Sequence, residues 1–166
     1  MGSDQHFQET FELAARIGGV LKERRQTIAV AESAAGGLIS AALLAVPGAS
    51  AYFVGGGVIY TGVARERLLG ISAADMARLR PATEAYARLL AERMRARLET
   101  TWALAETGAS GPTGNRYGDA PGHACIALSG PREIAITVET RSAEREPNMW
   151  RFTRAALELL ERALGE

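Results

Sequence analysis

Hydrophobic and polar positions alternate along the chain in two ways, and one of them predicts helices. Three long segments place apolar residues on one side at intervals of three and four, which indicates helices packed by one face. A fourth is apolar nearly all round, so we expect a helix that is covered on more than one side. The one-sided segments are residues 4–25, 84–98 and 147–164, the fourth is 38–46, and two shorter helical segments are 63–69, ended by Gly70, and 72–79.

The second pattern consists of short runs rich in β-branched and aromatic residues, and it predicts strands. The last two runs are joined by a turn at 129–132, which makes them an antiparallel hairpin. Strands that alternate with helices, together with one hairpin, predict a mixed sheet covered on both faces, a three-layer α/β/α sandwich. We expect one domain over residues 1–166, with its core at about 7–162. The strand segments are 26–31, 52–60, 101–107, 123–128 and 133–139.

Two glycine-rich stretches interrupt this regular pattern. Residues 55–57 are three glycines inside a predicted strand, which suggests that another backbone or a ligand approaches closely there. The segment 108–122 is the longest loop, and loops of more than ~12 residues in compact domains are usually functional or disordered. The helix at 38–46 and the strand after it are more apolar than one covered face requires, so we expect a homodimer or higher homo-oligomer.

Charge and cysteine content narrow the classes of function. Lys and Arg number 19, Asp and Glu number 19, and the pI is near neutral, so no global field attracts nucleic acid or an anionic membrane. No apolar run reaches the ~18 residues of a membrane span, and the first residues do not resemble a signal peptide. The single cysteine, Cys125, lies in an apolar run. We therefore expect a cytoplasmic protein with a buried, reduced Cys125.

Several familiar catalytic motifs are absent. Gly36-Gly37 fits neither a Walker phosphate loop nor a dinucleotide-binding fingerprint, and no Gly-x-Ser-x-Gly elbow occurs. His6 and His123 are far apart in the sequence, and only one cysteine accompanies them, so a zinc site is not expected. The sequence thus predicts neither a bound metal nor a cofactor.

Hydroxyl side chains lie at three of the predicted element ends. Ser33 follows the strand at 26–31, Ser50 lies just past the helix at 38–46, and Thr107 ends the strand at 101–107. Ligands of open α/β sheets bind beyond the carboxyl ends of the strands, so Ser33 and Thr107 converge if their strands are neighbours. The turn at Gly36-Gly37 also opens a helix, whose free N–H groups suit an anion. The alternative is that each hydroxyl only caps a helix or turn.

Four motifs, in the same order and over residues 7–162, closely resemble the C-terminal domain of the competence/damage-inducible CinA family. Stand-alone members of that family are nicotinamide mononucleotide (NMN) amidohydrolases, which convert NMN and water to nicotinic acid mononucleotide and ammonia. The resemblance therefore implies a small-molecule nucleotide as substrate. The motifs are Ala31-Glu32-Ser33 followed by Gly36-Gly37, Val46-Pro47-Gly48-Ala49-Ser50-Ala51-Tyr52-Phe53, Tyr60 followed by Arg67-Leu68-Leu69-Gly70-Ile71, and Thr107-Gly108-Ala109-Ser110-Gly111-Pro112.

The resemblance also implies roles for particular residues. The family nucleophile falls on Ser50, a tyrosine of the site on Tyr60, and the lysine presumed to be the base on Arg65. An acyl transfer needs such an activated hydroxyl, a base, and donors for the oxyanion and the phosphate. The positions that the resemblance assigns to substrate binding are Ser33, Gly36, Gly37, Thr107, Gly108 and Arg145.

Departures from the family pattern leave two functions open. A guanidinium stays protonated at ordinary pH, so Arg65 cannot accept the serine proton as a lysine amine would. Two polar residues after Ser33 are replaced by Ala34 and Ala35, and the loop 108–122 gains Arg116, Tyr117 and Asp119. One hypothesis is an NMN amidohydrolase that works without the lysine. The other is a family member that binds a nucleotide or another phosphate ligand without hydrolysing it.

Overall fold

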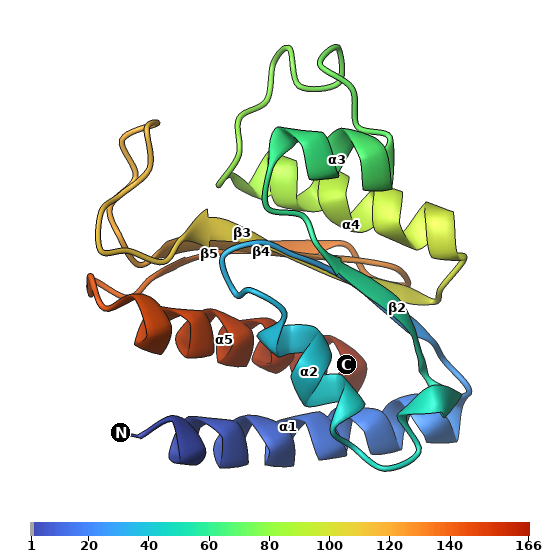
Figure 1. Cartoon of the computed structure of the whole chain (residues 1–166). Helices are drawn as coiled ribbons and strands as arrows, with labels where there is room; N and C mark the ends of the chain where they lie inside the picture. Colours follow the sequence, from blue (N-terminus) through green and yellow to red (C-terminus); the bar gives the residue numbers. More distant parts are fainter. Residues whose placement is uncertain (1) are drawn as a thin grey trace.

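A computed structural model describes residues 2–166 of the chain, and these residues form a five-stranded mixed sheet with helices on both faces (Figure 1). The strand order is β2-β1-β3-β4-β5. β1 pairs in parallel with β2 and β3, while β4 is antiparallel to both β3 and β5. The strands are β1 (Ile28–Glu32), β2 (Phe53–Val58), β3 (Trp102–Ala109), β4 (His123–Ser129) and β5 (Ile134–Glu139).

The helices complete a three-layer α/β/α arrangement, as the sequence predicts (Figure 1). α1, α2 and α5 pack together on one face of the sheet, whereas α4 covers the other face and carries α3 on its outside. The helices are α1 (Ser3–Arg24), α2 (Leu38–Leu44), α3 (Gly62–Leu69), α4 (Glu84–Leu98) and α5 (Arg145–Gly165), with a short 3₁₀ turn, η1, at Ala49–Ala51.

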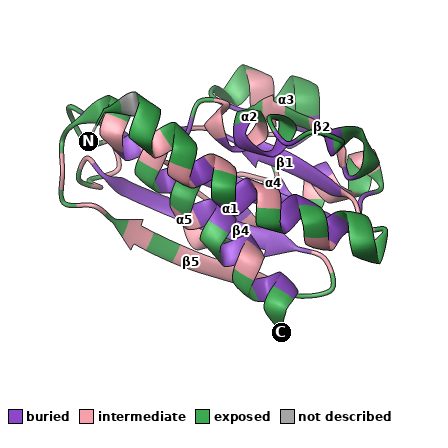
Figure 2. Ribbon diagram, turned by 90° about the horizontal axis from the view of Figure 1, so that it is seen from below, coloured by how far each residue is buried: buried purple, intermediate pink, exposed green. Residues whose placement is uncertain are grey.

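The two faces of the sheet carry side chains of different size because successive strand residues point to opposite faces. β1 sends Ile28 and Val30 toward α1, α2 and α5, and it sends Ala29 and Ala31 toward α4. β3 repeats this alternation and is buried up to Thr107, and β1 and β4 are buried along their whole length (Figure 2). Small residues under α4 let that helix lie close to the sheet. The N-cap of α4 is Thr83, whose side chain accepts a hydrogen bond from the Tyr86 N–H.

One predicted helix is wrong. Residues 73–78 form a series of turns. The Met76 N–H donates to the Ser72 carbonyl oxygen, as in an α-helix, whereas the Ala77 N–H donates to the nearer Ala74 carbonyl oxygen, as in a tighter turn. The Asp75 carboxylate accepts from the Ser72 N–H and hydroxyl, and Pro81 disfavours the α conformation at the residue before it. The other predicted elements differ from the observed ones by a few residues at their ends.

The glycines of β2 confirm the expected close approach, and the approaching group comes from the chain itself. A Cβ atom at Gly56 would lie 2.7 Å from the Ser40 hydroxyl and 3.1 Å from the Val30 carbonyl oxygen. Only glycine therefore lets β2 lie this close to β1 and α2. β2 is also an edge strand, and Val54 and Val58 on it are exposed.

Candidate ligand-binding site

A cavity of about 480 Å³ opens at the edge of the sheet where β1 and β3 end. These two strands are parallel neighbours with Ala31 opposite Ala105, so Ser33 and Thr107 extend from them side by side. Both residues line the cavity, as the sequence analysis expects if their strands are adjacent. The full lining is Ser33, Ile59, Tyr60, Thr61, Gly62, Arg65, Met76, Leu79, Arg80, Pro81, Ala82, Tyr86, Thr107, Gly108, Asn115, Arg116 and Tyr117.

Hydrogen bonds fix two of the polar side chains at this cavity. The Thr107 hydroxyl accepts from the Ala82 N–H at 3.1 Å, which leaves its own proton free to donate. The Tyr60 hydroxyl accepts from Arg145 at 3.0 Å, and the other end of the same guanidinium donates to the Gly111 carbonyl oxygen at 2.6 Å. Arg145 reaches the site from the start of α5.

Arg145 belongs to a second hollow, of about 210 Å³, that adjoins the first. The two share Tyr60, Gly108 and Asn115 as lining residues. An elongated ligand can therefore extend from Ser33 past Tyr60 toward Arg145. The polar ends of such a ligand would meet guanidinium groups at both places.

The charges along the main cavity are positive. Arg65, Arg80 and Arg116 line it, whereas its lining, all of it within the described chain, holds no carboxylate, histidine or lysine. The Arg65 guanidinium lies 5.8 Å from the centre of the Tyr86 ring. Its Nε is buried and has no hydrogen-bond partner within residues 2–166. The cavity thus favours an anionic ligand and contains no side chain that readily accepts a proton at neutral pH.

The loop at 108–122, which is held by hydrogen bonds and ring contacts, forms one rim of the cavity. Asp119 accepts two hydrogen bonds from Arg80, at 2.7 and 3.2 Å, and another from Asn115 at 2.7 Å. The Arg80 hydrogen bond, with help from Asn115, lowers the pKa of the Asp119 carboxyl to about 2. Arg80 and Arg116 both lie over the Tyr117 ring, 5.4 and 5.1 Å from its centre. The loop rises on the side of the sheet that α3 and α4 cover (Figure 1).

The glycine turn after β1 does not offer the anion site that the sequence suggests. Gly37 N–H donates to Glu32 at 2.9 Å, and Gly36 N–H donates to the Ser33 carbonyl oxygen at 3.0 Å. Neither glycine lines either hollow. Their φ angles of +69° and +101° explain why glycine stands there, because other residues avoid this backbone conformation. The structure therefore places Gly36 and Gly37 outside both hollows, and their substrate-binding role stays a prediction.

The carboxylates that occupy this turn are Glu32 and Glu106, and both are completely buried. Glu106 accepts from the N–H groups of Ser33 and Ala35 at 3.0 and 2.8 Å. Burial raises the pKa of its carboxyl to about 7, against the opposing effect of these hydrogen bonds. Glu106 is not among the site residues predicted from the sequence, although a carboxylate at the end of a buried apolar strand is a recognisable signal.

Ser50 lies away from the cavity, so the structure does not bring it together with Ser33 and Thr107 within one chain. It lies in η1, before β2 begins, and it is exposed. The cavity lies beyond the other end of β2, where Tyr60 follows the strand. Six residues of strand separate the two ends, which corresponds to about 20 Å. Within one chain, Ser50 cannot touch a ligand that contacts Ser33 and Thr107.

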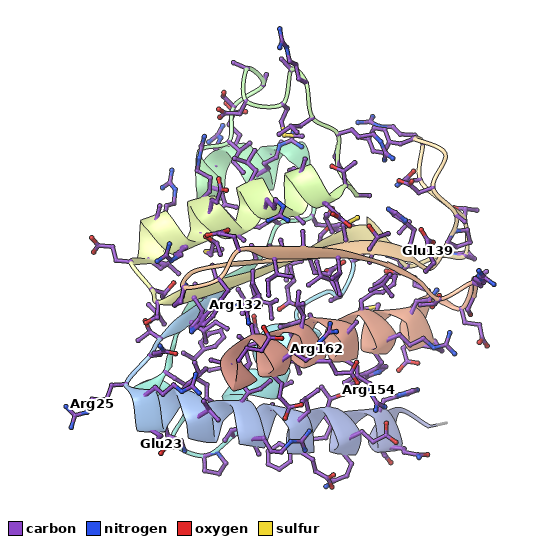
Figure 3. The ribbon with its side chains drawn as sticks, turned by 180° about the vertical axis from the view of Figure 1, so that it is seen from behind. Glu23, Arg25, Arg132, Glu139, Arg154 and Arg162 are labelled. Carbon is purple, nitrogen blue, oxygen red and sulfur yellow. The ribbon has the colours of Figure 1, made fainter. Side chains whose placement is uncertain are left out.

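His123 and Cys125 are buried and make their contacts within the protein. His123 Nδ1 lies 2.5 Å from Glu139 Oε1, at the end of β5 (Figure 3), and Nε2 lies 2.8 Å from the Ala82 carbonyl oxygen. Cys125 is buried, as expected. Among residues 2–166, no group of three or more His, Cys, Asp or Glu side chains is arranged to hold a metal ion. None of the helices in the described chain is long and apolar enough to cross a membrane.

The fold and the cavity define a class: an α/β/α domain with an arginine-rich pocket at the carboxyl ends of two parallel strands. Residues 10–164 match the family model of the CinA C-terminal domain, and the chain belongs to that family. The predicted family and fold are therefore confirmed.

Relatives and solved structures agree with this assignment. A CinA-like protein of Gloeobacter violaceus is 37% identical over 165 residues, which cover 98% of this chain and 39% of the relative. One of Synechococcus sp. (strain CC9902) is 38% identical over 133 residues, or 80% of this chain and 32% of the relative. The chain thus spans about a third of these curated relatives.

Two crystal structures illustrate the likeness in fold. Competence/damage inducible protein CihA of Agrobacterium tumefaciens superposes with a TM-score of 0.87 at 28% identity, covering 95% of this chain and 96% of the other. Competence damage-inducible protein A (ComA) of Klebsiella pneumoniae gives a TM-score of 0.89 at 25% identity, covering 95% and 98%.

Proposed function

We propose that the chain is a nicotinamide-nucleotide amidohydrolase of the CinA C-terminal type, which binds NMN in the cavity between Ser33, Tyr60 and Thr107. The observation that carries this proposal is one cavity that joins these hydroxyls to Arg65, Arg80 and Arg116. Guanidinium groups suit a phosphate, and hydroxyls suit acyl transfer. The family resemblance supplies the substrate.

We propose Ser33 as the nucleophile in place of Ser50, because Ser33 lines the cavity and Ser50 does not. Ser33 Oγ would attack the carboxamide carbon, and ammonia would leave with the proton from serine. Water would then hydrolyse the acyl-enzyme to the carboxylate of nicotinic acid mononucleotide and restore the hydroxyl. Thr107 and Tyr60 are placed to donate hydrogen bonds to the developing oxyanion or the substrate. Arg65 contributes charge to substrate binding.

A second candidate function is binding without hydrolysis, and one observation favours it. No carboxylate, histidine or lysine occurs among the cavity residues, which all belong to the described part of the chain. Proton transfer from Ser33 must therefore go through Tyr60 or water. Loss of a positioned general base typically costs ~10²- to 10⁴-fold in rate. Slow turnover or none, with NMN bound, is the expected signature of this second function.

Two measurements on three proteins separate these functions. NMN binding by calorimetry and ammonia release are compared for the wild type, Ser33→Ala and the matched control Ser50→Ala. We expect NMN to bind all three proteins, with any ammonia release abolished by Ser33→Ala and retained by Ser50→Ala. Binding without ammonia release in the wild type would select the second function. No binding at millimolar NMN would contradict both.

We also propose that two copies associate through β2 and the helices beside it. Leu44, Val54, Val58 and Val63 are exposed apolar residues on α2, β2 and the start of α3. The sequence of β2 holds no charged residue or proline, the usual protection of an edge strand. Exposed apolar surface of this kind usually marks a contact.

A further inference from the structure

Two carboxylates stand side by side beneath the turn that carries Ser33. Glu32 ends β1, and Glu106 lies on β3 at the equivalent height, since Ala31 pairs with Ala105. Both side chains are completely buried, and both accept hydrogen bonds only from the segment 33–40 among the described residues. The two carboxylates thus hold this segment by hydrogen bonds from inside the protein, while Ser33 lines the cavity.

The two carboxylates are satisfied to different degrees. Both oxygens of Glu32 accept hydrogen bonds, from Gly37, Ile39 and Ser40, at 2.8 to 3.1 Å. Glu106 uses only Oε2, which holds Ser33 and Ala35. Its Oε1 is buried and has no partner within residues 2–166. A fully buried carboxylate with one unpaired oxygen, beside a second carboxylate, has a strong tendency to take up a proton.

We propose that Glu106 is a positioning residue for the cavity: its carboxylate fixes the Ser33–Ala35 turn, and its protonation loosens this turn and weakens ligand binding. The negatively charged form accepts charge-assisted hydrogen bonds from the Ser33 and Ala35 N–H groups. The protonated form keeps only a neutral acceptor on Oε2, which is about half as strong. Ser33 is therefore held more firmly when Glu106 is ionised.

The groups around Glu106 explain why its carboxyl takes up a proton near neutral pH. From β1 the charged group that faces it is Glu32, which favours protonation. β4 places Ile126 opposite it, and α2 carries no charged residue. From α5, the uncharged Met149 lies against Gly36 of this segment, and the uncharged Asn148 donates to the Ser110 carbonyl oxygen. Burial is the larger cause of the raised pKa, which lies at about 7, so the change falls near neutral pH.

The test follows the backbone amide signals of Ser33 and Ala35 by NMR from pH 5.5 to 8.5, in the wild type and in Glu106→Gln. Glutamine keeps a carbonyl acceptor for both N–H groups and cannot titrate. We expect both amides to titrate with one midpoint near pH 7 in the wild type and to stay flat in Glu106→Gln. No inflection in the wild type, or one that persists in Glu106→Gln, would overturn the proposal.

A binding measurement extends the test and rests on the proposed function. NMN affinity is measured at pH 6 and pH 8, and Glu106→Gln corrects for the titration of the NMN phosphate itself. We expect the wild type to gain about fivefold more affinity than Glu106→Gln over this range. Equal gains would overturn the link to binding. Amides that titrate in a protein that never binds NMN would refute the proposed function and support the positioning of the turn.

A second readout covers the case in which Glu106→Gln does not fold. The side-chain carboxyl carbon of Glu106 is then followed in the wild type alone. A midpoint shared with the Ser33 and Ala35 amides would support the proposal. A carboxyl signal that does not change between pH 5.5 and 8.5, or one with a different midpoint, would overturn it.

Discussion

At the scale of single residues, we propose that Arg65 favours binding of an anion in the cavity over catalysis. Its Nε is buried without a partner in the described chain, and an unpaired buried donor costs about 1–3 kcal/mol. A ligand that supplies an acceptor removes this cost, so Arg65 favours binding of an anion. The same guanidinium cannot take the proton from Ser33. Arg65 thus supports binding and does not support general-base catalysis.

The first prediction is that Arg65→Lys increases ammonia release from NMN. A lysine amine on a stem of similar length can lose its proton and act as a base, and a positioned base contributes ~10²- to 10⁴-fold. The double variant Arg65→Lys with Ser33→Ala serves as the control and should be inactive. A single variant no faster than the wild type, with NMN still bound, would show that another residue limits the reaction.

The second prediction concerns stability and pH. The folded state raises the Glu106 pKa from 4.5 to about 7, so between these values the folded protein holds a proton that the unfolded chain has lost. Stability due to this group therefore falls as pH rises from about 4.5 to 7, by roughly 3 kcal/mol, and then stays constant. Urea unfolding at pH 5 and pH 8 should show this fall in the wild type relative to Glu106→Gln. Parallel behaviour of the two proteins would contradict it.

The positions of two site residues were predictable from the sequence, because the direction of their strands alone brings them together. Ser33 and Thr107 end parallel strands, so their convergence follows from the order of the sheet. Glu106 was missed because the hydrogen bonds that it makes run to a turn 71 to 73 residues away in the chain. Periodicity gives the face on which a side chain lies, and it cannot give the partner that the side chain meets across the sheet.

At the scale of elements, the segment after β1 owes its shape to carboxylates from inside the protein. α2 has only seven residues, and Glu32 accepts hydrogen bonds from N–H groups in its first turn. The anion that the sequence leads one to expect at this helix start is thus part of the chain. We therefore expect a ligand phosphate to bind at the guanidinium groups of the cavity instead of at this helix start.

The third prediction is that Glu32→Ala destabilises the protein far more than the loss of an exposed carboxylate. Several N–H groups and the Ser40 hydroxyl would lose a charged acceptor inside the protein, where each such bond contributes about 1.5–3 kcal/mol. We expect a loss of about 3–5 kcal/mol in urea unfolding. The control Glu158→Ala removes an exposed ion pair with Arg154 and should cost less than about 1 kcal/mol. Equal losses would refute the role of Glu32.

Chain direction also explains why Ser50 lies apart from Ser33 in space. It lies close to Ser33 in the sequence, separated mainly by α2, and a motif match carries no information on distance. β2 runs parallel to β1, so a residue before β2 lies at the opposite edge from one after β1. The predicted helix at 72–79 failed for a local reason. Ser72 and Asp75 exchange hydrogen bonds in the way that begins a helix, but Pro81 disfavours the α conformation at the residue before it.

At the scale of the whole molecule, the layers followed from sequence, because long amphipathic helices and buried apolar strands leave few alternatives. The sheet ends on one side at β2, with Val54 and Val58 exposed, and on the other side at β5. Contacts between copies lie beyond what periodicity within one chain can predict. The unprotected edge at β2 is nevertheless visible in both sequence and structure.

The fourth prediction is that the protein forms a dimer through this edge. Light scattering at micromolar concentrations should give twice the monomer mass. Val54→Lys combined with Val58→Lys should give a monomer, because lysine on an edge strand opposes pairing with another chain. Gln8→Lys, on the exposed side of α1, should leave the mass unchanged. A wild-type protein with the monomer mass would contradict this prediction.

The central claim is that NMN occupies the cavity at the ends of β1 and β3. The most direct test is a crystal structure of the wild-type protein grown with saturating NMN. We expect electron density for NMN, or for its acid product, in contact with Ser33 and Arg65. Density at the Ser50 end of β2, or a fully occupied NMN elsewhere with this cavity free of ligand, would contradict it.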